Sequence, residues 1–522
     1  MEYAIAVIDI GMTNKKVAVY DDTLRQLDAQ YHNFEPEIVD GLQCHDLEAM
    51  EEWFLACLGE AGKKYPVKAI AVSTHGATFV CLGRDGKPAL PCVYYTHEPV
   101  SASDASSPVS GAGKDFHRRF YERFGPAAEL QARTGTPAFE AMINPAKGIF
   151  FAQEQFPQAF KNVSLILPYP QYWGFRLTGK AGVESTYMGC HSYLWDQVDH
   201  CLSSVARDLG VAPLLPDNLN RSWDVMGTIS EEAAQKTGLS PDTIVTMGIH
   251  DSNASLLPHF AQKGESGFVL NSTGTWCVMM NPVKEYGFVP EELGKVVFFN
   301  ISAFGTPVKT AIFLGGQEFE TWSKILMTRH QREDFPPYDE GRYRNILQKA
   351  DCFLMPELVA GSGQFPGSKP RVTEGGKTWF YEDIAHAFEG NAGREGAGLP
   401  PCFNDYEQGF AVLRISLVMQ SLVALERTGL KPGQEIFTEG GFRKNEAYNR
   451  LLSSAFRDNK VYLTSIAEAS ALGAAMTAKM ALSGKSLGEL AGDFEVDYQE
   501  VQKSDIPELF SYRKAWMEQI AN

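Results

Sequence analysis

The sequence predicts an α/β protein built from two related halves, and three observations lead to this prediction. Stretches typical of buried strands alternate with helical patterns along much of the chain. Two similar hairpin patterns, at residues 4–20 and 267–280, open the two halves. Near the middle of the chain, a strand-like run over 243–247 leads through Gly248 to Asp251, where an apolar helical pattern begins. A strand that hands over to a helix in this way is a common edge of a ligand site in α/β proteins.

Length and composition set the broad class of the protein. A chain of 522 residues is expected to form two large domains or three ordinary ones. The formal net charge of −17 disfavours a nucleic-acid partner, because proteins that bind the phosphate backbone usually carry a positive field. The nine cysteines are odd in number and include no Cys-x-x-Cys pair. We therefore expect neither a disulfide framework nor a thiolate zinc site, and a reducing compartment fits best.

The N-terminal residues read as a first strand and not as a signal peptide, since they lack a basic region and reach an acid early at Asp9. No apolar run is expected to approach the ~20 residues of a membrane span. The sequence thus predicts a cytoplasmic protein with no membrane partner.

The first hairpin pattern has a polar turn between two apolar runs, 4–8 and 17–20. Glycine at position 11 permits close backbone approach, Thr13 and Asn14 offer hydrogen-bond donors, and Lys15 and Lys16 add positive charge. Such a turn could hold phosphate. The alternative is an ordinary hairpin with a solvated tip, and for a lone hairpin this alternative would be favoured.

The second hairpin pattern changes that balance. Residues 267–280 again read as strand, Gly/Thr turn and strand, and Thr275 follows Thr13 by 262 positions (275 − 13), almost half the chain. A matched pair of polar hairpins is what a two-sided phosphate clamp requires. Gly274 and Thr275 would form its second side.

Asp251 can be interpreted in two ways. As a carboxylate at a helix start it could serve as an N-cap, a role worth ~1 kcal/mol. It could also accept a proton from a ligand bound above it. The neighbouring His250 and Asn253 favour the second interpretation, because both can hold hydroxyl groups.

Three further segments are candidate ligand contacts. A strand at 67–72 ends in the polar run 73–78, although His75 alone is weak evidence for a site. A strand at 435–438 leads into Gly440, Gly441 and Asn445, a surface on which a flat ring or a phosphate could lie against backbone. The small-residue helix over 468–475 suits tight packing against either a neighbouring helix or a nucleotide. Residues 101–114 are of low complexity and are expected to form a loop.

Several motifs are absent from the sequence. It contains no Gly-x4-Gly-Lys-Ser/Thr loop, no Gly-x-Gly-x-x-Gly after a strand, no Gly-x-Ser-x-Gly elbow and no His-Glu-x-x-His. P-loop ATPases, dinucleotide dehydrogenases, serine hydrolases and zinc proteases of that type are therefore disfavoured.

Four segments together resemble the FGGY family of carbohydrate kinases. They are the phosphate-type turns at 9–15 and 271–276, the adenosine-type segment at 439–445 and the aspartate segment at 248–253. Each is weak alone, but the four occur in the family's order and span nearly the whole chain. The resemblance implies two ribonuclease-H-like domains of the actin/hexokinase type with the active site in the cleft between them. The implied domains are 1–247, with the sugar side and the first hairpin, and 248–522, with the second hairpin and the adenosine site.

The resemblance also implies roles for individual residues, with ATP and Mg²⁺ as cofactors. Asp251 would be the general base, and Asp9 would hold Mg²⁺, through water. The residues implied to bind ATP are Thr13, Asn14, Lys15, Lys16, Gly274, Thr275, Gly440, Gly441 and Asn445. Those implied to bind the sugar are Thr74, His75, Gly76, His250 and Asn253.

Within the family, the sequence is most similar to L-fuculokinases and L-rhamnulokinases. The similarity lies in Thr74-His75-Gly76, in residues 175–179, in the His250-Asp251 pair and in residues 274–276. The sequence departs from the family at Thr96-His97-Glu98 and at Gln171, and these departures bear on which sugar is bound. A ketose, L-fuculose or L-rhamnulose, is the expected substrate. A homodimer is compatible with the resemblance, although the sequence itself names no oligomeric state.

Three alternatives stay open at this point. An actin- or Hsp70-like ATPase would share the two phosphate hairpins but would not need the segments around Thr74 and Asp251. A non-catalytic sugar-binding regulator is disfavoured by the intact Asp9, Thr13, Asp251 and Thr275. A kinase for xylulose, ribulose or glycerol would share the whole pattern.

Overall fold

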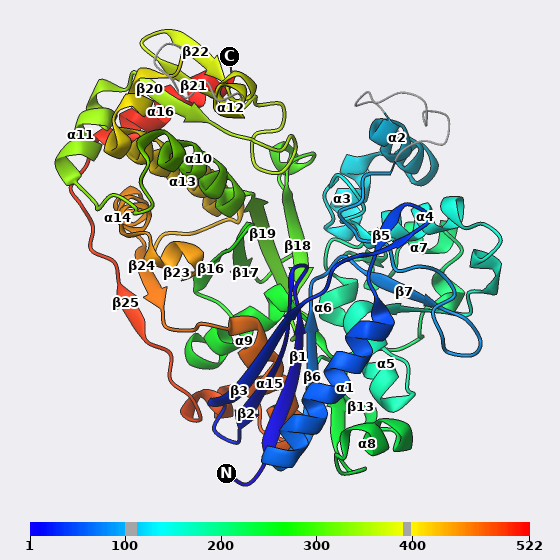
Figure 1. Ribbon diagram of the computed structural model, residues 1–522. Helices are drawn as coiled ribbons and strands as arrows, with labels where there is room; N and C mark the ends of the chain where they lie inside the picture. The colour runs from blue at the N-terminus through cyan, green and yellow to red at the C-terminus, as the bar shows by residue number, and fades with distance from the viewer. Residues whose placement is uncertain (100–111, 390–397, 522) are drawn as a thin grey trace.

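The computed structural model describes residues 1–99, 112–389 and 398–521, and Figure 1 shows its course. Two seven-stranded mixed sheets form the framework, one in each half of the chain. The first sheet contains, in spatial order, β13 (Val225–Thr228), β14 (Ile244–Thr246), β6 (Val67–Thr74), β1 (Ala4–Ile10), β2 (Asn14–Asp21) and β3 (Gln26–Asn33), with β15 (Ile249–His250) also paired to β6. The second contains β18 (Val297–Ile301), β19 (Pro307–Phe313), β17 (Cys277–Pro282), β16 (Phe268–Thr273), β23 (Glu435–Gly440), β24 (Lys460–Thr464) and β25 (Tyr498–Glu500).

The two sheets have the same strand order and the same directions. In each, a hairpin (β1–β2 or β16–β17) has its first strand parallel to a later strand, β6 or β23. A second parallel strand follows (β14 or β24), and an antiparallel strand (β13 or β25) closes that edge. The hairpin's second strand pairs antiparallel with β3 or β19. This correspondence confirms the prediction of two related α/β halves that open with matched hairpins.

Helices cover both faces of each sheet. The outer face of the first sheet packs against α1 (Leu47–Lys64), α5 (Tyr169–Thr178) and α8 (Glu231–Thr237). The outer face of the second packs against α10 (Gly315–His330), α11 (Glu340–Lys349), α13 (Tyr406–Arg427), α14 (Glu446–Ala455) and α16 (Glu508–Ala521). Between the sheets lie α9 (Asp251–Lys263) and α15 (Ala469–Ser483), which share one apolar core with both inner faces (Figure 1).

The alternation of side chains along β1 and β2 explains how one hairpin serves two cores. Val7 faces the inner core with α9 and α15, whereas Ile8 faces the outer core with α1 and α5. On β2 the inner face includes Ala18 and the outer face Val17. The same period puts Lys16 on the inner side and Lys15 on the outer side.

Each half carries an additional layer. In the N-terminal half, a separate apolar cluster joins α2 (Ala112–Phe124), α3 (Ala127–Thr134), α4 (Pro145–Gln155) and α7 (Ser204–Asp208) to the hairpin β4 (Glu37–Val39) and β5 (Leu42–Cys44) and to the pair β7 (Phe79–Leu82) and β8 (Leu165–Pro168). In the C-terminal half, β20 (Cys352–Met355), β21 (Arg371–Glu374) and β22 (Lys377–Phe380) form a small sheet followed by α12 (Tyr381–Glu389). The short elements are α6 (Ser185–Met188), β9 (Val183–Glu184), β10 (Trp195–Asp196), β11 (Cys201–Leu202) and β12 (Leu219–Asn220).

Helix α13 corrects one expectation from the sequence. Within the described residues it is long and apolar enough to cross a membrane, with a mean hydropathy of 1.5 in its most apolar window, although no apolar run of that length was expected. In the structure 94% of that window is buried, because the helix runs through the core of the C-terminal half.

The strand before Asp251 differs in detail from its prediction. It ends at Thr246 and resumes as β15, and Gly248 lies between the two pieces with φ +82°. A side chain there would lie 2.9 Å from Pro170 and 3.1 Å from the Val72 carbonyl oxygen, so this kink requires glycine. The chain thereby enters α9 from the first sheet.

Two further expectations concern chain organisation. The expected loop at 101–114 lies outside the described residues up to position 111, and α2 begins at Ala112. The domain boundary at 247/248 stays a prediction. It falls one residue before β15, which pairs with β6 of the first sheet, while α9 lies between the sheets.

Candidate active site

The amino ends of α9 and α15 meet at the end of β1, between the two halves. Asp251 is the first residue of α9, and Asp9 lies near the carboxyl end of β1 on the inner face of the sheet. Ser470, in the first turn of α15, donates from Oγ to Asp9 Oδ2 at 2.9 Å. Helix amino ends favour negative charge, so two carboxylates and a bound anion can gather here.

Asp251 does not serve as the N-cap of α9. The cap position is His250, whose side chain makes no capping bond, and Asp251 is the first helical residue. Its Oδ1 accepts from Ser252 N at 2.5 Å and from Ser252 Oγ at 3.1 Å. Among the described residues these contacts and the nearby His250 ring all involve Oδ1 and not Oδ2. About a third of the side chain (32%) is exposed.

The electrostatic surroundings of Asp251 suit a base that works near neutral pH. Desolvation, with a further contribution from the charge of Asp9, raises its pKa to about 7, although the Ser252 bonds oppose the shift. A carboxylate with such a pKa can take a proton from a hydroxyl more readily than an ordinary aspartate.

His250 is held in place by three neighbours. Its backbone N donates to Thr186 Oγ1 at 3.0 Å, and its Nδ1 lies 3.1 Å from Asn253 Nδ2. Its Nε2 lies 3.2 Å from Asp251 Oδ1. Burial lowers the pKa of His250 to about 3, so the imidazole is neutral at physiological pH. The second neighbour of Nε2 is Cys190 Sγ, at 3.5 Å.

On the inner face of the first hairpin, Asp9 is part of an ion cluster. Lys16 Nζ lies 3.0 Å from Asp9 Oδ2 and 2.5 Å from Glu468 Oε2, the residue before α15. Burial lowers the pKa of Lys16, but the charges of Asp9 and Glu468 raise it by more, so the net shift is upward. Lys16 therefore stays a cation beside the proposed phosphate position.

The structure separates the two lysines of the first hairpin. Lys15 is buried on the outer side, where Nζ donates to the Met12 carbonyl oxygen at 2.7 Å. Burial lowers its pKa to about 8. Thr13 and Asn14 at the tip are exposed. That all four residues bind phosphate stays a prediction, and the geometry places Lys16 nearest to Asp9 and α15.

The tip of the second hairpin is positioned by close backbone contacts. A Cβ on Gly440 would lie 2.0 Å from the Thr273 carbonyl oxygen, and one on Gly316, at the start of α10, would lie 1.9 Å from the Gly274 carbonyl oxygen. Thr273 Oγ1 also accepts from Phe442 N at 2.9 Å. The turn carrying Gly274 and Thr275 is thus packed against α10 on one side and the end of β23 on the other.

Two cavities meet at this second hairpin. One, of about 240 Å³, contains the catalytic candidate and the start of α15; it is lined by residues including Asp251, Ser252, Ser272, Glu439, Gly440, Glu468 and Ser470. The other, of about 510 Å³, is lined by residues including Gly274, Thr275, Phe319, Tyr338, Gly441, Phe442 and Asn445. Gly440 and Gly441 are adjacent in sequence and face one cavity each. That phosphates and an adenosine bind in these two cavities stays a prediction.

Asn445 lies where its amide can serve two purposes. Its Oδ1 accepts from Tyr448 N at 3.2 Å and caps α14, while its buried Nδ2 has no protein partner. An unpaired buried donor at a cavity wall is a natural ligand contact.

The predicted sugar residues are not equivalent in the structure. Thr74 Oγ1 is buried and donates to the His75 carbonyl oxygen at 2.9 Å. A Cβ on Gly76 would lie 2.8 Å from the His250 ring, so glycine leaves room for that imidazole. Both ring nitrogens of His75 are buried without a partner, and its pKa is lowered, chiefly by burial. Contact of these residues with a sugar stays a prediction.

Several neighbours of the site were missed from the sequence. Tyr95 packs against His75 with ring centroids 5.0 Å apart, and burial together with the charge of Asp251 raises its pKa to about 12. Glu468 and Ser470 belong to the small-residue segment at 468–475, whose sequence suited a nucleotide as well as a helix. No sequence pattern pointed to Tyr95 or Cys190.

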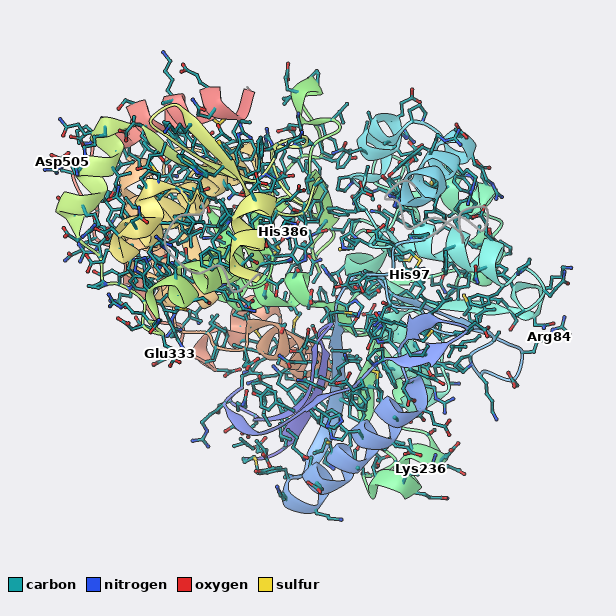
Figure 2. The ribbon with its side chains drawn as sticks, turned by 45° about the horizontal axis from the view of Figure 1, so that its top comes forward. Arg84, His97, Lys236, Glu333, His386 and Asp505 are labelled. Atoms are coloured by element: carbon teal, nitrogen blue, oxygen red, sulfur yellow. The ribbon has the colours of Figure 1, made fainter. Side chains whose placement is uncertain are left out.

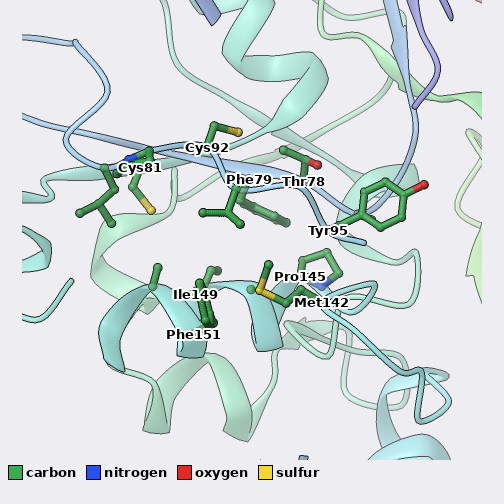
Figure 3. A pocket seen from close by; sticks show the side chains of 15 residues that line it. Thr78, Phe79, Cys81, Cys92, Tyr95, Met142, Pro145, Ile149 and Phe151 are labelled. Atoms are coloured by element: carbon green, nitrogen blue, oxygen red, sulfur yellow. The ribbon is translucent and has the colours of Figure 1, made fainter. Parts of the chain in front are cut away.

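A small apolar cavity of about 50 Å³ lies beside Tyr95 (Figure 3). Its lining includes Phe79, Met142, Ile149 and Phe151, and none of the predicted site residues. It belongs to the additional layer of the N-terminal half.

The two departures from the family pattern lie in different surroundings. Gln171 is fully buried and donates from Nε2 to the Met247 carbonyl oxygen at 2.7 Å, just before Gly248. His97 lies on the N-terminal half (Figure 2) and packs on Phe151 with ring centroids 5.3 Å apart. Gln171 therefore fixes the backbone just before α9. Neither Gln171 nor His97 lines the two cavities at Asp251 and Asn445.

Comparison with known protein families matches both halves of the chain to the same family. Residues 4–258 match the N-terminal domain of the FGGY family of carbohydrate kinases. Residues 265–388 match a model described as the C-terminal domain of carbohydrate kinase FGGY. Gly440, Gly441 and Asn445 lie beyond the matched ranges.

Curated relatives are similar over parts of the chain. Rhamnulokinase of Halalkalibacterium halodurans is 23% identical over 290 residues, and L-fuculokinase of Escherichia coli K12 is 24% identical over 282; each match covers 53% of this chain and 56% of the relative. Ribulokinase 2 of Staphylococcus saprophyticus is 38% identical over 108 residues, 21% of this chain and 19% of the relative. The chain thus spans between about a fifth and just over half of the length of these relatives.

Solved structures are similar over the whole chain, and one of them illustrates the likeness. A carbohydrate kinase from Novosphingobium aromaticivorans superposes with a TM-score of 0.77 at 26% identity, covering 100% of this chain and 99% of the other. The two-domain fold predicted from the sequence, with its paired ribonuclease-H-like sheets, is confirmed by this match and by the two domain models.

Proposed function

Because the chain belongs to the FGGY family of carbohydrate kinases, we propose that it transfers the γ-phosphoryl group of ATP to a hydroxyl of a small ketose, with L-fuculose and L-rhamnulose as first candidates. The observation that carries this proposal is the placement of Asp251. Its carboxylate lines the same cavity as Gly440 and Ser470, next to a larger cavity with an unpaired amide donor from Asn445. In this proposal the smaller cavity holds the phosphates beside the base, and the larger cavity holds the adenosine.

In this proposal Asp251 acts as general base. The acceptor hydroxyl gives its proton to Asp251 Oδ2, and its oxygen attacks the γ-phosphorus while the bond to the bridging oxygen of the β-phosphate breaks and ADP leaves. The protein contributes mainly position and charge, because the reaction needs little covalent chemistry from it. Lys16 and the amino end of α15 would offset negative charge on the phosphates.

The site fits both ATP and Mg²⁺. The glycines at 316 and 440 keep side chains away from the turn at 274–275, which leaves backbone exposed to a phosphate. Asp9 Oδ2 is engaged by Lys16 and Ser470, and its Oδ1 would reach Mg²⁺ through water. When bound, Mg²⁺ would neutralise phosphate charge and orient the transferred group.

The choice of a ketose follows from the relatives. Ribulokinase, rhamnulokinase and L-fuculokinase are each similar to part of this chain. His75, with both ring nitrogens buried and unpaired, and Tyr95 are the groups we propose to contact the sugar, together with Gly76, His250 and Asn253. A cytoplasmic location is proposed as well, since all nine cysteines are free thiols and eight are buried.

A coupled ADP-release assay over a panel of acceptors tests the proposal. The panel contains L-fuculose, L-rhamnulose, ribulose, xylulose and glycerol. We expect ADP release to require one ketose and Mg²⁺. ATP hydrolysis that no acceptor changes would instead support an actin-like ATPase, and sugar binding without ADP would support a regulator.

Replacement of the base tests the mechanism. We expect Asp251→Asn to lower kcat by ~10²–10⁴-fold, the usual contribution of a general base, while ATP still binds. In the wild type, kcat/KM should fall about tenfold for each pH unit below about 7, because the base must be deprotonated. A folded Asp251→Asn enzyme with normal kcat, or a flat profile between pH 5 and 7, would contradict the assignment.

A further inference from the structure

A cluster of metal-binding side chains lies directly behind the proposed base. Cys190, His191 and His250 each present one ligand atom, and these atoms lie within 4.8 Å of one another. Asp251 Oδ1 lies beside this group of three, 3.2 Å from His250 Nε2. The four residues come from two places in the chain, the end of α6 and the start of α9, which the Thr186–His250 bond holds together.

Two distances between these atoms equal edges of a tetrahedral zinc site. Bond lengths of about 2.3 Å to sulfur and about 2.0 Å to nitrogen or oxygen put neighbouring ligand atoms about 3.3–3.6 Å apart. Cys190 Sγ and His250 Nε2 are 3.5 Å apart, and His250 Nε2 and Asp251 Oδ1 are 3.2 Å apart. His191 has a buried Nδ1 without a protein partner, and its ligand atom lies within 4.8 Å of those of Cys190 and His250.

The surroundings can also supply the hydrogen bond that a metal-binding histidine needs. With Nε2 on the metal, His250 carries its proton on Nδ1, which lies beside the Asn253 amide. A half-turn of that amide would present Oδ1, which is otherwise buried and unpaired, to the Nδ1 proton. A donor–acceptor pair of this kind fixes the tautomer of metal-bound histidines.

We propose that Cys190, His191, His250 and Asp251 form an inhibitory site for Zn²⁺ or a similar soft divalent cation. Binding replaces the thiol proton of Cys190, which goes to solvent, and engages the Asp251 carboxylate in a metal bond. The base is then unable to take a proton from the acceptor. Mg²⁺ does not compete, because it prefers oxygen ligands and octahedral geometry.

Metal binding and its consequence are separable. The inhibitory effect rests on the proposed function of Asp251, whereas binding rests only on the geometry of the four side chains. The test therefore has a spectroscopic arm and a kinetic arm.

The spectroscopic arm uses Co²⁺ as a probe, with the full-length protein purified free of metal. We expect one equivalent to give a thiolate-to-cobalt charge-transfer band and the intense visible bands of a tetrahedral ion, and Zn²⁺ to abolish both. Cys190→Ser should lose the charge-transfer band. Cys201→Ser, which removes the exposed cysteine, should keep it. A band that survives in Cys190→Ser, or no tetrahedral spectrum at all, would overturn the site.

The kinetic arm measures inhibition by buffered free Zn²⁺ at saturating Mg²⁺ and ATP, relative to each variant's own uninhibited rate. Removing a ligand should weaken inhibition by at least the roughly 10–100-fold that loss of a supporting partner costs. We expect this for Cys190→Ser and for His191→Ala, with Cys201→Ser unchanged. Equal inhibition of all four enzymes, or relief by added Mg²⁺, would place zinc at the Mg²⁺–ATP position and overturn the proposal. No turnover in any protein, with the cobalt spectrum intact, would contradict the proposed function but not the metal site.

Discussion

The two hairpins occupy the same position in their sheets but carry opposite chemistry. By strand register, Asp9 corresponds to Ser272, Lys16 to Val278 and Lys15 to Cys277. Their tips differ by one residue, 11–14 in the first hairpin against 274–276 in the second. The first hairpin therefore carries charged side chains at these positions, whereas the second has a neutral backbone turn between two close glycine contacts.

This difference shows how a duplicated framework can serve an asymmetric ligand. A nucleoside triphosphate needs a metal and cations beside its terminal phosphates and only dipoles and a flat surface beside its ribose and base. The charge of Asp9 in the first hairpin reaches Asp251, whereas the neutral hairpin lines both cavities, through Ser272 on one side and Gly274 and Thr275 on the other. Substitutions at corresponding positions of the two hairpins should therefore change activity and stability by unequal amounts.

The largest effect is expected at Asp9. Asp9→Asn should lower kcat by ~10²-fold or more, because it removes the proposed Mg²⁺ contact and a metal supplies several kcal/mol of transition-state stabilisation. The corresponding change in the second hairpin, Ser272→Ala, should alter kcat by less than about threefold. Steady-state kinetics over a Mg²⁺ titration measures both. Normal turnover of Asp9→Asn at saturating Mg²⁺ would show that Asp9 contributes no more to catalysis than Ser272.

Lys15 should affect stability more than catalysis. Its pKa is about 8 when folded and 10.5 when unfolded, so between these values the unfolded chain binds more protons. Lys15 should therefore contribute a rise of up to ~3 kcal/mol in the free energy of unfolding from pH 8 to 10.5, measured as the difference between the wild type and Lys15→Met. Urea denaturation at several pH values tests this, and an equal slope in both proteins would show that burial does not neutralise Lys15.

Glycine substitutions should destabilise the two hairpin tips to different extents. Gly316→Ala places a Cβ 1.9 Å from the Gly274 carbonyl oxygen and should cost about 1–3 kcal/mol of stability and raise KM for ATP. Gly11→Ala meets only the Asn14 carbonyl oxygen, at 3.2 Å, and should cost below about 1 kcal/mol. Thermal unfolding and ATP titration give the comparison. Equal losses would mean that both tips are held by backbone packing.

The smallest effect is expected at Asn445. Asn445→Asp keeps the oxygen that caps α14 but removes the Nδ2 donor and adds a negative charge to the neutral side, so KM for ATP should rise by about five- to tenfold, as for one lost hydrogen bond. Asn445→Ala should in addition lose ~1 kcal/mol of stability with the cap. An unchanged KM for ATP in both variants would show that Asn445 does not contact the nucleotide.

Local patterns were sufficient for the framework. Strand periodicity and turn residues predicted both hairpins, which the structure has as β1–β2 and β16–β17. These features depend on neighbours in sequence, so they are visible without a fold.

The sequence by itself determined the two related α/β halves, the family and the candidate residues at Asp9, Asp251 and Asn445. Only the tertiary structure decided that Lys15 and Lys16 face opposite sides and that His250, not Asp251, occupies the N-cap position of α9. It also brought Cys190 within 3.5 Å of His250, although the spacing of the cysteines predicted no zinc site with thiolate ligands. The physical reason is range: a motif records contacts a few residues apart, whereas burial, pKa and metal geometry depend on atoms that approach only when distant segments pack together.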